Sequence, residues 1–240
     1  MQFPEPATWQ LEVASVTAVT PRMRSIELSS PALSSFTYLP GQDLALGFRR
    51  DDGTTVRRRY TIRRFSPERR RLELQVVMHG NGPGIRWAQA ASPGIAIEAI
   101  GPRGKISLAS DCHWHLFAGD ATAVPSALAM MEALPRDIPA RAYLQVDDEG
   151  EQQPFDLGGD KRVAWQYEQG ETSGIIGALS SASLPDGRGH AYLAGEVSHV
   201  LALKAVLLDR GWDADQISAK AYWNRGRPNA DRGEPEQRAS

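Results

Sequence analysis

The chain has 240 residues, of which 41% are hydrophobic and 23% are charged. This composition is that of an ordinary globular protein with room for one large domain or two modest ones, and it excludes a disordered, fibrous or disulfide-rich chain. The single cysteine, Cys112, excludes an intrachain disulfide and any iron–sulfur cluster held by several cysteines of this chain.

The net charge of -2 conceals an asymmetry between the two halves. Residues 1–110 carry 15 Lys and Arg against 9 Asp and Glu, whereas residues 111–240 carry 12 against 20. A basic half next to an acidic half is consistent with an anionic ligand held mainly by the first half. The sequence MQFPEPATWQ lacks the features of a signal peptide, and no segment is apolar for the roughly 20 residues that a membrane span needs. We therefore expect a cytoplasmic location and no membrane partner.

The first half of the chain predicts β-strands. Stretches rich in Val, Ile, Leu, Thr and aromatic residues are separated by turn residues such as Pro, Gly and Asp. They cover residues 9–19, 23–28, 43–48, 54–65, 72–79 and 95–100. About six short strands at this spacing favour a small antiparallel barrel. One helix fits before the last strand, beginning near Pro83 and ending at about Ala91, because proline suits the first turn of a helix.

In the second half, strand-like and helical stretches alternate. Strands are expected at residues 113–118, 140–146, 163–167, 191–194 and 216–223, and helices at 124–134, 172–180 and 200–210. Such alternation builds a parallel sheet with helices on both faces. We therefore predict a barrel domain over residues 1–110 and a Rossmann-like α/β domain over 111–240, with a disordered tail from about residue 228. This is the plan of the ferredoxin-reductase-like flavoenzymes, although a fold does not by itself give a function.

The segment from Val56 to Phe65 is rich in arginine. In a strand, Arg58 and Tyr60 lie on one face, and Thr61 and Arg63 on the other. A flavin dinucleotide needs a charged fork for its pyrophosphate, which arginine supplies, and a flat partner for its ring, which tyrosine supplies. A hydroxyl such as that of Thr61 can hydrogen-bond the flavin N5 atom. The same segment taken alone can equally be a solvated basic strand.

The pattern Arg-x-Tyr-Thr-x-Arg resembles the flavin signature of the siderophore-interacting protein family. Other segments resemble that family in the same order along the chain: residues 78–88, 101–104, 118–125, 194–196 and 222–223. The similarity extends from about Trp9 to Arg227. The family's serine after Gly-Pro-Ala appears here as Ile85, with Gly84 before it, and the family's terminal arginine appears as Asn224, followed by Arg225.

The resemblance implies an enzyme that passes electrons from NADH or NADPH through FAD to a ferric siderophore or another ferric chelate, releasing iron(II). Tyr60 and Thr61 would be the catalytic residues, in contact with the flavin ring. The implied cofactor-binding residues are Arg58, Tyr60, Thr61, Arg63, His79, Gly82, Pro83, Trp87, Gly119, Asp120, Thr122, Pro125, Gly195, Glu196 and Trp223. An anionic siderophore also implies a basic mouth, for which the candidates are Arg50, Arg225 and Arg227. We expect a monomer.

Several alternatives remain open from the residues themselves. Tyr60 and Trp87 can be core aromatic residues, and His79 can be structural. The fold also suits a general NAD(P)H–flavin reductase with a protein or small ferric-chelate acceptor. The arginine strand can also indicate a nucleic-acid-binding module, which the negative net charge disfavours. The sequence Cys112-His113-x-His115 has ligand types that suit zinc, but no second cluster supplies more ligands, so we predict no metal site.

Overall fold

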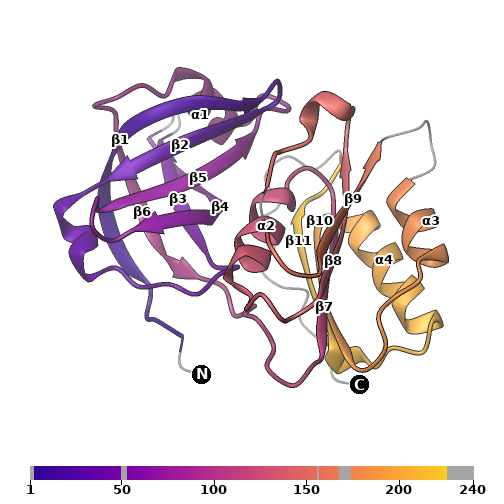
Figure 1. Ribbon diagram of the computed structural model, residues 1–240. Coiled ribbons are helices and arrows are strands. Elements are labelled where there is room, and N and C mark those ends of the chain that lie inside the picture. The colour runs from indigo at the N-terminus through magenta and orange to yellow at the C-terminus, as the bar shows by residue number, and fades with distance from the viewer. Residues whose placement is uncertain (1–2, 50–52, 156, 168–173, 226–240) are drawn as a thin grey trace. The chain divides into compact units, whose positions relative to one another are not determined.

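The computed structural model describes residues 3–49, 53–155, 157–167 and 174–225 (Figure 1). The chain forms two compact units. The first unit consists of the residues up to Leu108 together with Leu128–Ala133, and the second consists of Ala109–Ala127 and the chain from Leu134 onward. The predicted disordered tail from about residue 228 lies outside the described residues.

The first unit is a closed antiparallel barrel with the strand order β1-β2-β5-β4-β3-β6. Its strands are β1 (Ala7–Thr20), β2 (Met23–Ser29), β3 (Asp43–Arg49), β4 (Thr55–Ser66), β5 (Arg71–Val77) and β6 (Ala96–Arg103). Helix α1 (Pro83–Ala90) lies between β5 and β6 in the chain, and a short 3-10 turn, Pro31–Ser35, follows β2. The predicted six-stranded antiparallel barrel is confirmed.

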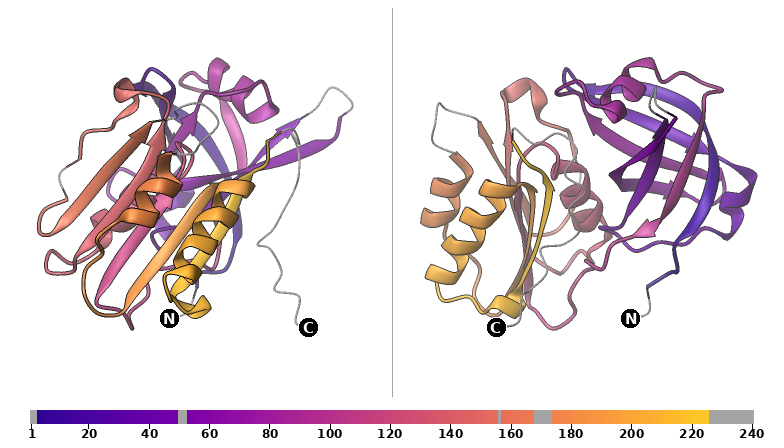
Figure 2. Two further views of the ribbon diagram at one scale, coloured as in Figure 1. Left: turned by 90° about the vertical axis from the view of Figure 1, so that its right-hand side faces the viewer. Right: turned by 180° about the vertical axis from the view of Figure 1, so that it is seen from behind.

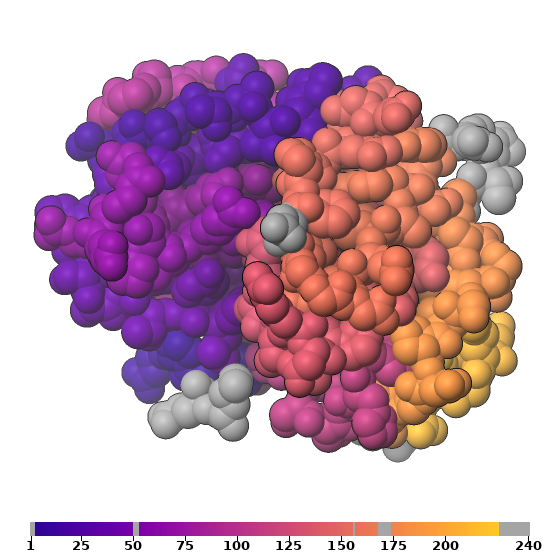
Figure 3. Space-filling view, in the orientation of Figure 1, coloured from indigo at the N-terminus to yellow at the C-terminus, as the bar shows by residue number. Residues whose placement is uncertain are grey.

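Alternation along the strands creates the core of the barrel. Successive side chains of a strand face opposite sides of the sheet, so residues two positions apart share a face. In several strands, two such residues point into the barrel. Fully or almost fully buried pairs are Leu11 and Val13, Ile26 and Leu28, Leu44 and Leu46, and Leu72 and Leu74. In the space-filling view, side chains cover the face of the unit that is turned toward the viewer (Figure 3). The core therefore fixes which face of β4 carries polar side chains.

The second unit contains a parallel sheet of five strands in the order β11-β10-β7-β8-β9. The strands are β7 (Trp114–Gly119), β8 (Ala140–Val146), β9 (Lys161–Tyr167), β10 (Gly189–Glu196) and β11 (Ile217–Trp223). Its helices are α3 (Gly174–Ser181) and α4 (Val197–Asp209), with 3-10 turns at Glu149–Glu151 and Ala214–Gln216, and helix α2 (Val124–Ala133) begins in this unit. Strands and helices alternate, as the sequence predicts, and the α/β architecture is confirmed.

Helices α3 and α4 cover one face of the sheet (Figures 1 and 2). The inward residues of β7 and β10 on this face pack against Ile175 and Leu179 of α3 and Leu203 and Leu207 of α4. The beginning of α2 lies on the opposite face, where the Tyr222 hydroxyl donates to Ser126 Oγ at 3.2 Å. No helix among the described residues has the length and apolar character needed to cross a membrane.

The strand predicted at residues 72–79 ends earlier than expected, at Val77. Three residues later, Gly80 adopts φ 74°, a left-handed conformation that turns the chain toward α1. His79 consequently lies in a connecting loop and is exposed.

Candidate functional site

Strand β4 carries the first group of predicted cofactor residues. Arg58 is half-buried, and its Nη1 donates to the backbone carbonyl of Arg57 at 2.7 Å. Tyr60 is also half-buried and packs against the barrel core. Burial raises the pKa of Tyr60 to about 12, although the charge of Arg58 acts to lower it, so the phenol is neutral at physiological pH. Thr61 is 9% exposed. The strand thus brings a guanidinium, a phenol ring and a hydroxyl into adjacent positions.

Arg63, predicted to bind the cofactor, has a carboxylate partner within the first unit. The buried guanidinium forms a two-point ion pair with Glu132, with N–O distances of 2.7 and 2.6 Å. The exposed Arg64 donates to the same carboxylate at 3.0 Å. Burial acts to raise the pKa of Glu132, but the hydrogen bonds from Arg63 and Arg64 prevail and lower it to about 2. The cofactor role of Arg63 stays a prediction, since Glu132 occupies the end of its guanidinium fork.

The first turn of α1 has the properties of an anion site. Gly82 precedes the helix, Pro83 opens it, and no side chain of the described residues caps the N-terminus by a hydrogen bond. A side chain added at Gly80 or Gly82 would meet no heavy atom of the described part of the chain within 4 Å, so the backbone there is open to a ligand. Free N–H groups and the helix dipole both favour a phosphate at such a position.

Trp87 lies one turn further along α1, and its ring packs near that of Phe48, with 5.7 Å between the centroids. Within the described residues, Nε1 of Trp87 is buried and has no hydrogen-bond partner. A buried indole N–H normally has a partner. An aromatic platform, an open helix N-terminus and an orphaned N–H donor together fit a flavin nucleotide.

Two other arginines of β4 are paired with acidic residues of β3 and of β6, the strand beyond β3. Arg57 contacts Glu98 of β6 at 2.8 Å, and Arg59 contacts Asp43 of β3 at 2.8 Å. These carboxylates reduce the positive charge that the sequence suggests for β4. The pairing disfavours the alternative of a nucleic-acid-binding strand, for which uncompensated arginines would be needed to contact phosphates.

The carboxyl edge of the parallel sheet holds most of the second group of predicted residues. Asp120, directly after β7, accepts hydrogen bonds from four donors. Its Oδ1 accepts from the Thr122 backbone N–H at 2.8 Å and from the Thr122 hydroxyl at 2.5 Å. Its Oδ2 accepts from the Glu196 backbone N–H at 2.7 Å and from Trp223 Nε1 at 2.9 Å. One carboxylate therefore joins the ends of β7, β10 and β11.

Two glycines allow this arrangement. A side chain at Gly119 would lie 2.1 Å from the carbonyl oxygen of Ala194, and one at Gly195 would lie 2.5 Å from Asp120 Oδ2. Gly195 also has φ 127°, a conformation that L-residues rarely adopt. Ligands of open α/β sheets bind at this edge of the strands. The structure thus brings Gly119, Asp120, Thr122, Gly195, Glu196 and Trp223 together, and buried Pro125 lies in the adjoining first turn of α2.

Glu196 is the N-cap of α4. Its carboxylate accepts from the backbone N–H groups of Ser198 at 2.6 Å and His199 at 3.3 Å, and from the Ser198 hydroxyl. Its other oxygen accepts from the Arg225 backbone N–H at 3.1 Å. Burial acts to raise the pKa of Glu196, but these hydrogen bonds prevail and lower it. Arg225 is exposed, whereas Arg50 and Arg227, the other predicted substrate residues, lie outside the described residues.

Glu132 and Gly84 are not among the site residues that the sequence predicts. Glu132 is an ordinary helix position by pattern, and its pairing with Arg63 spans 69 residues of chain. Gly84 departs from the family pattern in the sequence, which is the one signal that singled it out. Both residues matter because of their contacts in the folded protein, Glu132 with Arg63 and Gly84 with Tyr60.

The cysteine–histidine segment forms a buried cluster with Tyr192 at the start of the sheet. Cys112 Sγ lies 3.7 Å from His115 Nε2, and the Tyr192 hydroxyl lies 3.3 Å from His115 Nδ1. Burial, and to a smaller extent the charge of His190, lowers the pKa of His115 to about 4. In the part of the chain that the structure describes, no three His, Cys, Asp or Glu side chains are arranged to hold a metal ion.

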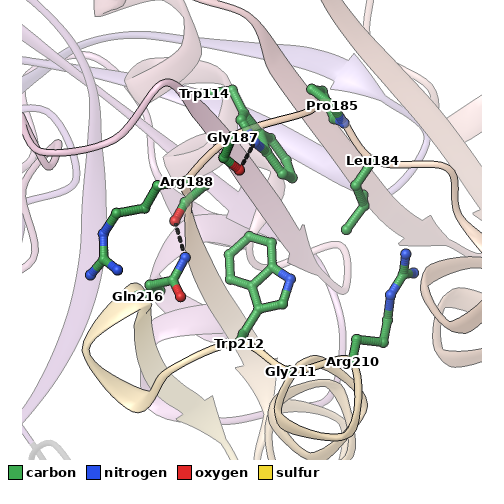
Figure 4. Close-up of a pocket in the computed structure, with 10 residues that line it drawn as sticks. Trp114, Leu184, Pro185, Gly187, Arg188, Arg210, Gly211, Trp212 and Gln216 are labelled. Carbon is green, nitrogen blue, oxygen red and sulfur yellow. Dashed lines mark hydrogen bonds between the residues drawn. The ribbon is translucent and has the colours of Figure 1, made fainter.

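A pocket of about 430 Å³ lies in the second unit, at the amino ends of β7 and β10 (Figure 4). Its lining residues are Trp114, Leu184, Pro185, Gly187, Arg188, Gly189, Arg210, Gly211, Trp212 and Gln216. Gln216 donates to the Gly189 carbonyl at 2.8 Å, and Arg210 donates to the Ala182 carbonyl at 2.7 Å. Because the pocket is at the opposite ends of these strands from Gly119 and Glu196, it is separate from the predicted nicotinamide site.

Comparison with known proteins relates both units to one family. Residues 112–226 match the family model described as siderophore-interacting protein, and residues 45–106 match the siderophore-interacting FAD-binding domain. The ferric vibriobactin reductase ViuB of Vibrio cholerae is 32% identical over 178 residues, a match that covers 72% of this chain and 66% of ViuB. The chain thus spans slightly less than two thirds of the length of that relative.

Solved structures agree with this relationship. A siderophore utilization protein from T. fusca superposes with a TM-score of 0.86 and 28% identity, covering 96% of this chain and 97% of that one. The ferredoxin reductase of carbazole 1,9a-dioxygenase shares the fold, with a TM-score of 0.76 and 21% identity, over 90% of this chain and 69% of that one. The two family models together match more than half of the 240 residues, and the chain belongs to the siderophore-interacting protein family.

Proposed function

We propose that this protein is an FAD-dependent reductase that takes electrons from NADH or NADPH and passes them to ferric siderophores. The observation that carries the proposal is the close approach of Tyr60 of β4 to the first turn of α1, whose N-terminus no side chain of the described residues caps. An aromatic ring and an anion-binding helix end are the two features that a flavin dinucleotide requires. The match of residues 45–106 to an FAD-binding domain supports the same conclusion.

In this proposal each residue on the flavin side has a separate task. The Tyr60 ring would stack on the isoalloxazine, and the Thr61 hydroxyl would offer the ring a hydrogen bond. Arg58 and the first turn of α1 would hold the pyrophosphate, and Trp87 Nε1 would donate a hydrogen bond to the cofactor. Bound FAD would supply the redox chemistry, by accepting hydride from a nicotinamide and delivering single electrons to iron(III).

The carboxyl edge of the sheet would receive the nicotinamide nucleotide. Asp120 already accepts four hydrogen bonds, so its part is to hold the backbone around Gly119 and Gly195 in place for the ligand. The absence of side chains at these two glycines lets a ligand approach the backbone closely. The same family relationship supports a nicotinamide donor without distinguishing NADH from NADPH.

The proposed substrate is a ferric siderophore, whose anionic form would be attracted by arginine. Iron(II) binds hard oxygen ligands less tightly than iron(III), so reduction releases the metal. We propose that Arg225, which is exposed, contributes to substrate binding together with Arg50 and Arg227. Replacing Arg225 and Arg227 by Ala should weaken the binding of anionic siderophores more than that of neutral ones, and an equal effect on both classes would remove this assignment.

The test is reconstitution with FAD followed by anaerobic reduction. The wild-type protein should bind FAD with a change in its visible absorption spectrum, and NADH or NADPH should bleach that spectrum. Adding a ferric siderophore should then restore the oxidised spectrum and produce iron(II), detected with a ferrous chelator. A protein that binds no FAD contradicts the proposal. The rival function, a general flavin reductase, predicts equal turnover with ferric citrate and with ferric siderophores.

A further inference from the structure

Gly84, in the first turn of α1, leaves a space that the Tyr60 side chain fills. A methyl group on Gly84 would lie 2.0 Å from the Tyr60 hydroxyl oxygen and 3.2 Å from the ring carbon that bears it. Its next neighbour would be the ring of Phe48, at 3.5 Å. Side-chain carbons in proteins essentially never approach another heavy atom closer than 3.0 Å. Alanine at position 84 therefore requires Tyr60 to move.

The backbone conformation does not explain this glycine. Gly84 is within α1 and is not among the residues with positive φ, so an L-residue suits its dihedral angles. In a helix, alanine is more favourable than glycine by about 1 kcal/mol. What position 84 requires is space, and the side chain that uses the space is that of Tyr60.

Tyr60 has little freedom to yield. Its backbone is held in β4, where it pairs with Leu44 of β3, and its ring packs against the barrel core. The hydroxyl is at the end of a rigid ring, so it can move only if the whole ring tilts. The volume of residue 84 consequently sets the angle of the Tyr60 ring.

We propose that Gly84 is a positioning residue for the flavin. Because it has no side chain, the Tyr60 ring can lie against the first turn of α1, and the surface on which the isoalloxazine stacks is held next to the turn that holds the pyrophosphate. This inference rests on the proposed function. In this inference Gly84 does not contact the cofactor. Its lack of a side chain sets the distance between the Tyr60 ring and the turn that holds the pyrophosphate.

The test is a double-mutant cycle of Gly84→Ala and Tyr60→Phe, with FAD affinity and flavin fluorescence quenching as readouts. Gly84→Ala should raise the Kd for FAD about tenfold and reduce the quenching, because a displaced ring stacks poorly. Tyr60→Phe removes the oxygen that would collide but keeps the ring, and its own Kd for FAD is the reference for the double variant. In the double variant, FAD affinity should return to within about twofold of that of Tyr60→Phe.

A matched control is Gly177→Ala in α3, an exposed helical position with no heavy atom within 4 Å of the added carbon. This variant should keep the wild-type Kd and should not lose thermal stability. If Gly84→Ala binds FAD as tightly as the wild type and quenches it equally, Gly84 does not position the ring. If the double variant binds FAD as weakly as Gly84→Ala, the loss of affinity does not come from a collision with the Tyr60 hydroxyl, and the inference is also wrong.

The outcomes separate this inference from the proposed function. Wild-type protein that binds FAD while the cycle shows no coupling contradicts only the role of Gly84. Wild-type protein that binds no FAD contradicts the proposed function. If Gly84→Ala alone does not fold, the double variant should fold, because it lacks the colliding oxygen, and thermal unfolding of the two apoproteins measures the difference.

Discussion

The flavin side of the barrel and the carboxyl edge of the sheet use similar residue types in different ways. On the barrel, Tyr60 and Trp87 are part of the packing but keep features that a ligand can use, such as an orphaned indole N–H. At the sheet edge, Asp120 is already saturated by Thr122, Glu196 and Trp223. We propose that the first region contacts a ligand directly, whereas the hydrogen bonds of the second hold a backbone shape.

This difference shows that residues of one family signature need not have one kind of role. A carboxylate with four hydrogen bonds has no remaining capacity for a strong ligand contact, so changing it should affect stability before binding. Removing an N–H donor that has no partner should instead affect ligand binding before stability. Measurements of stability and cofactor affinity in the same variants can therefore separate the two regions.

The largest expected effect is that of Asp120→Ala. Loss of four hydrogen bonds to a charged group, which leaves their donors without a partner, should lower the free energy of unfolding by about 3–5 kcal/mol. Urea denaturation followed by tryptophan fluorescence measures this change. The control is Asp209→Ala at the exposed end of α4, which should stay within about 0.5 kcal/mol of the wild type. Equal effects of the two variants would show that the Asp120 network does not stabilise the fold.

The second prediction concerns Glu132→Gln, which removes the charge opposite the buried Arg63. The variant should lose about 3 kcal/mol of stability at neutral pH, because a buried guanidinium would lack a counter-charge. The pKa of Glu132 is lowered from 4.5 to about 2 in the folded protein, so its stabilising effect is complete above about pH 4.5. The effect is lost as the pH falls toward 2, and the stability difference between wild type and variant should close over that range.

The two arginines that share Glu132 provide an internal control. Arg63 is 4% exposed and Arg64 is 61% exposed at the side chain. Arg63→Ala should therefore destabilise strongly, whereas Arg64→Ala should cost no more than about 1 kcal/mol. If both variants lose the same stability, burial does not determine the strength of these ion pairs. Strong destabilisation by Arg63→Ala would also show that Arg63, like Asp120, stabilises the fold.

The smallest expected change in stability is that of Trp87→Phe. Because Nε1 has no partner within the described residues, its removal breaks no hydrogen bond of the apoprotein, and stability should change by no more than about 1 kcal/mol. The Kd for FAD should rise about fivefold if this N–H donates to the cofactor. Calorimetry of the apoprotein and FAD titration give the two numbers. An unchanged Kd would mean that Trp87 serves only in packing.

The sequence alone determined the elements and their order. Strand β8 has the predicted bounds of residues 140–146, and the six barrel strands lie where turn residues and alternation predict them. These features are local, because the spacing of apolar residues in a strand or helix is visible within its own short stretch of sequence. The family motifs are also local, which is why the resemblance was visible before the structure.

Only the tertiary structure decided which partners the motif residues have. Asp120 meets Glu196 and Trp223 from 76 and 103 residues away, and Arg63 meets Glu132 from 69 residues away. The fit of Tyr60 against Gly84 depends in the same way on the packing of α1 against the barrel. Hydrogen bonding and packing act over a few ångströms in space, whereas sequence patterns report neighbours along the chain, so the partner of each site residue followed from the fold.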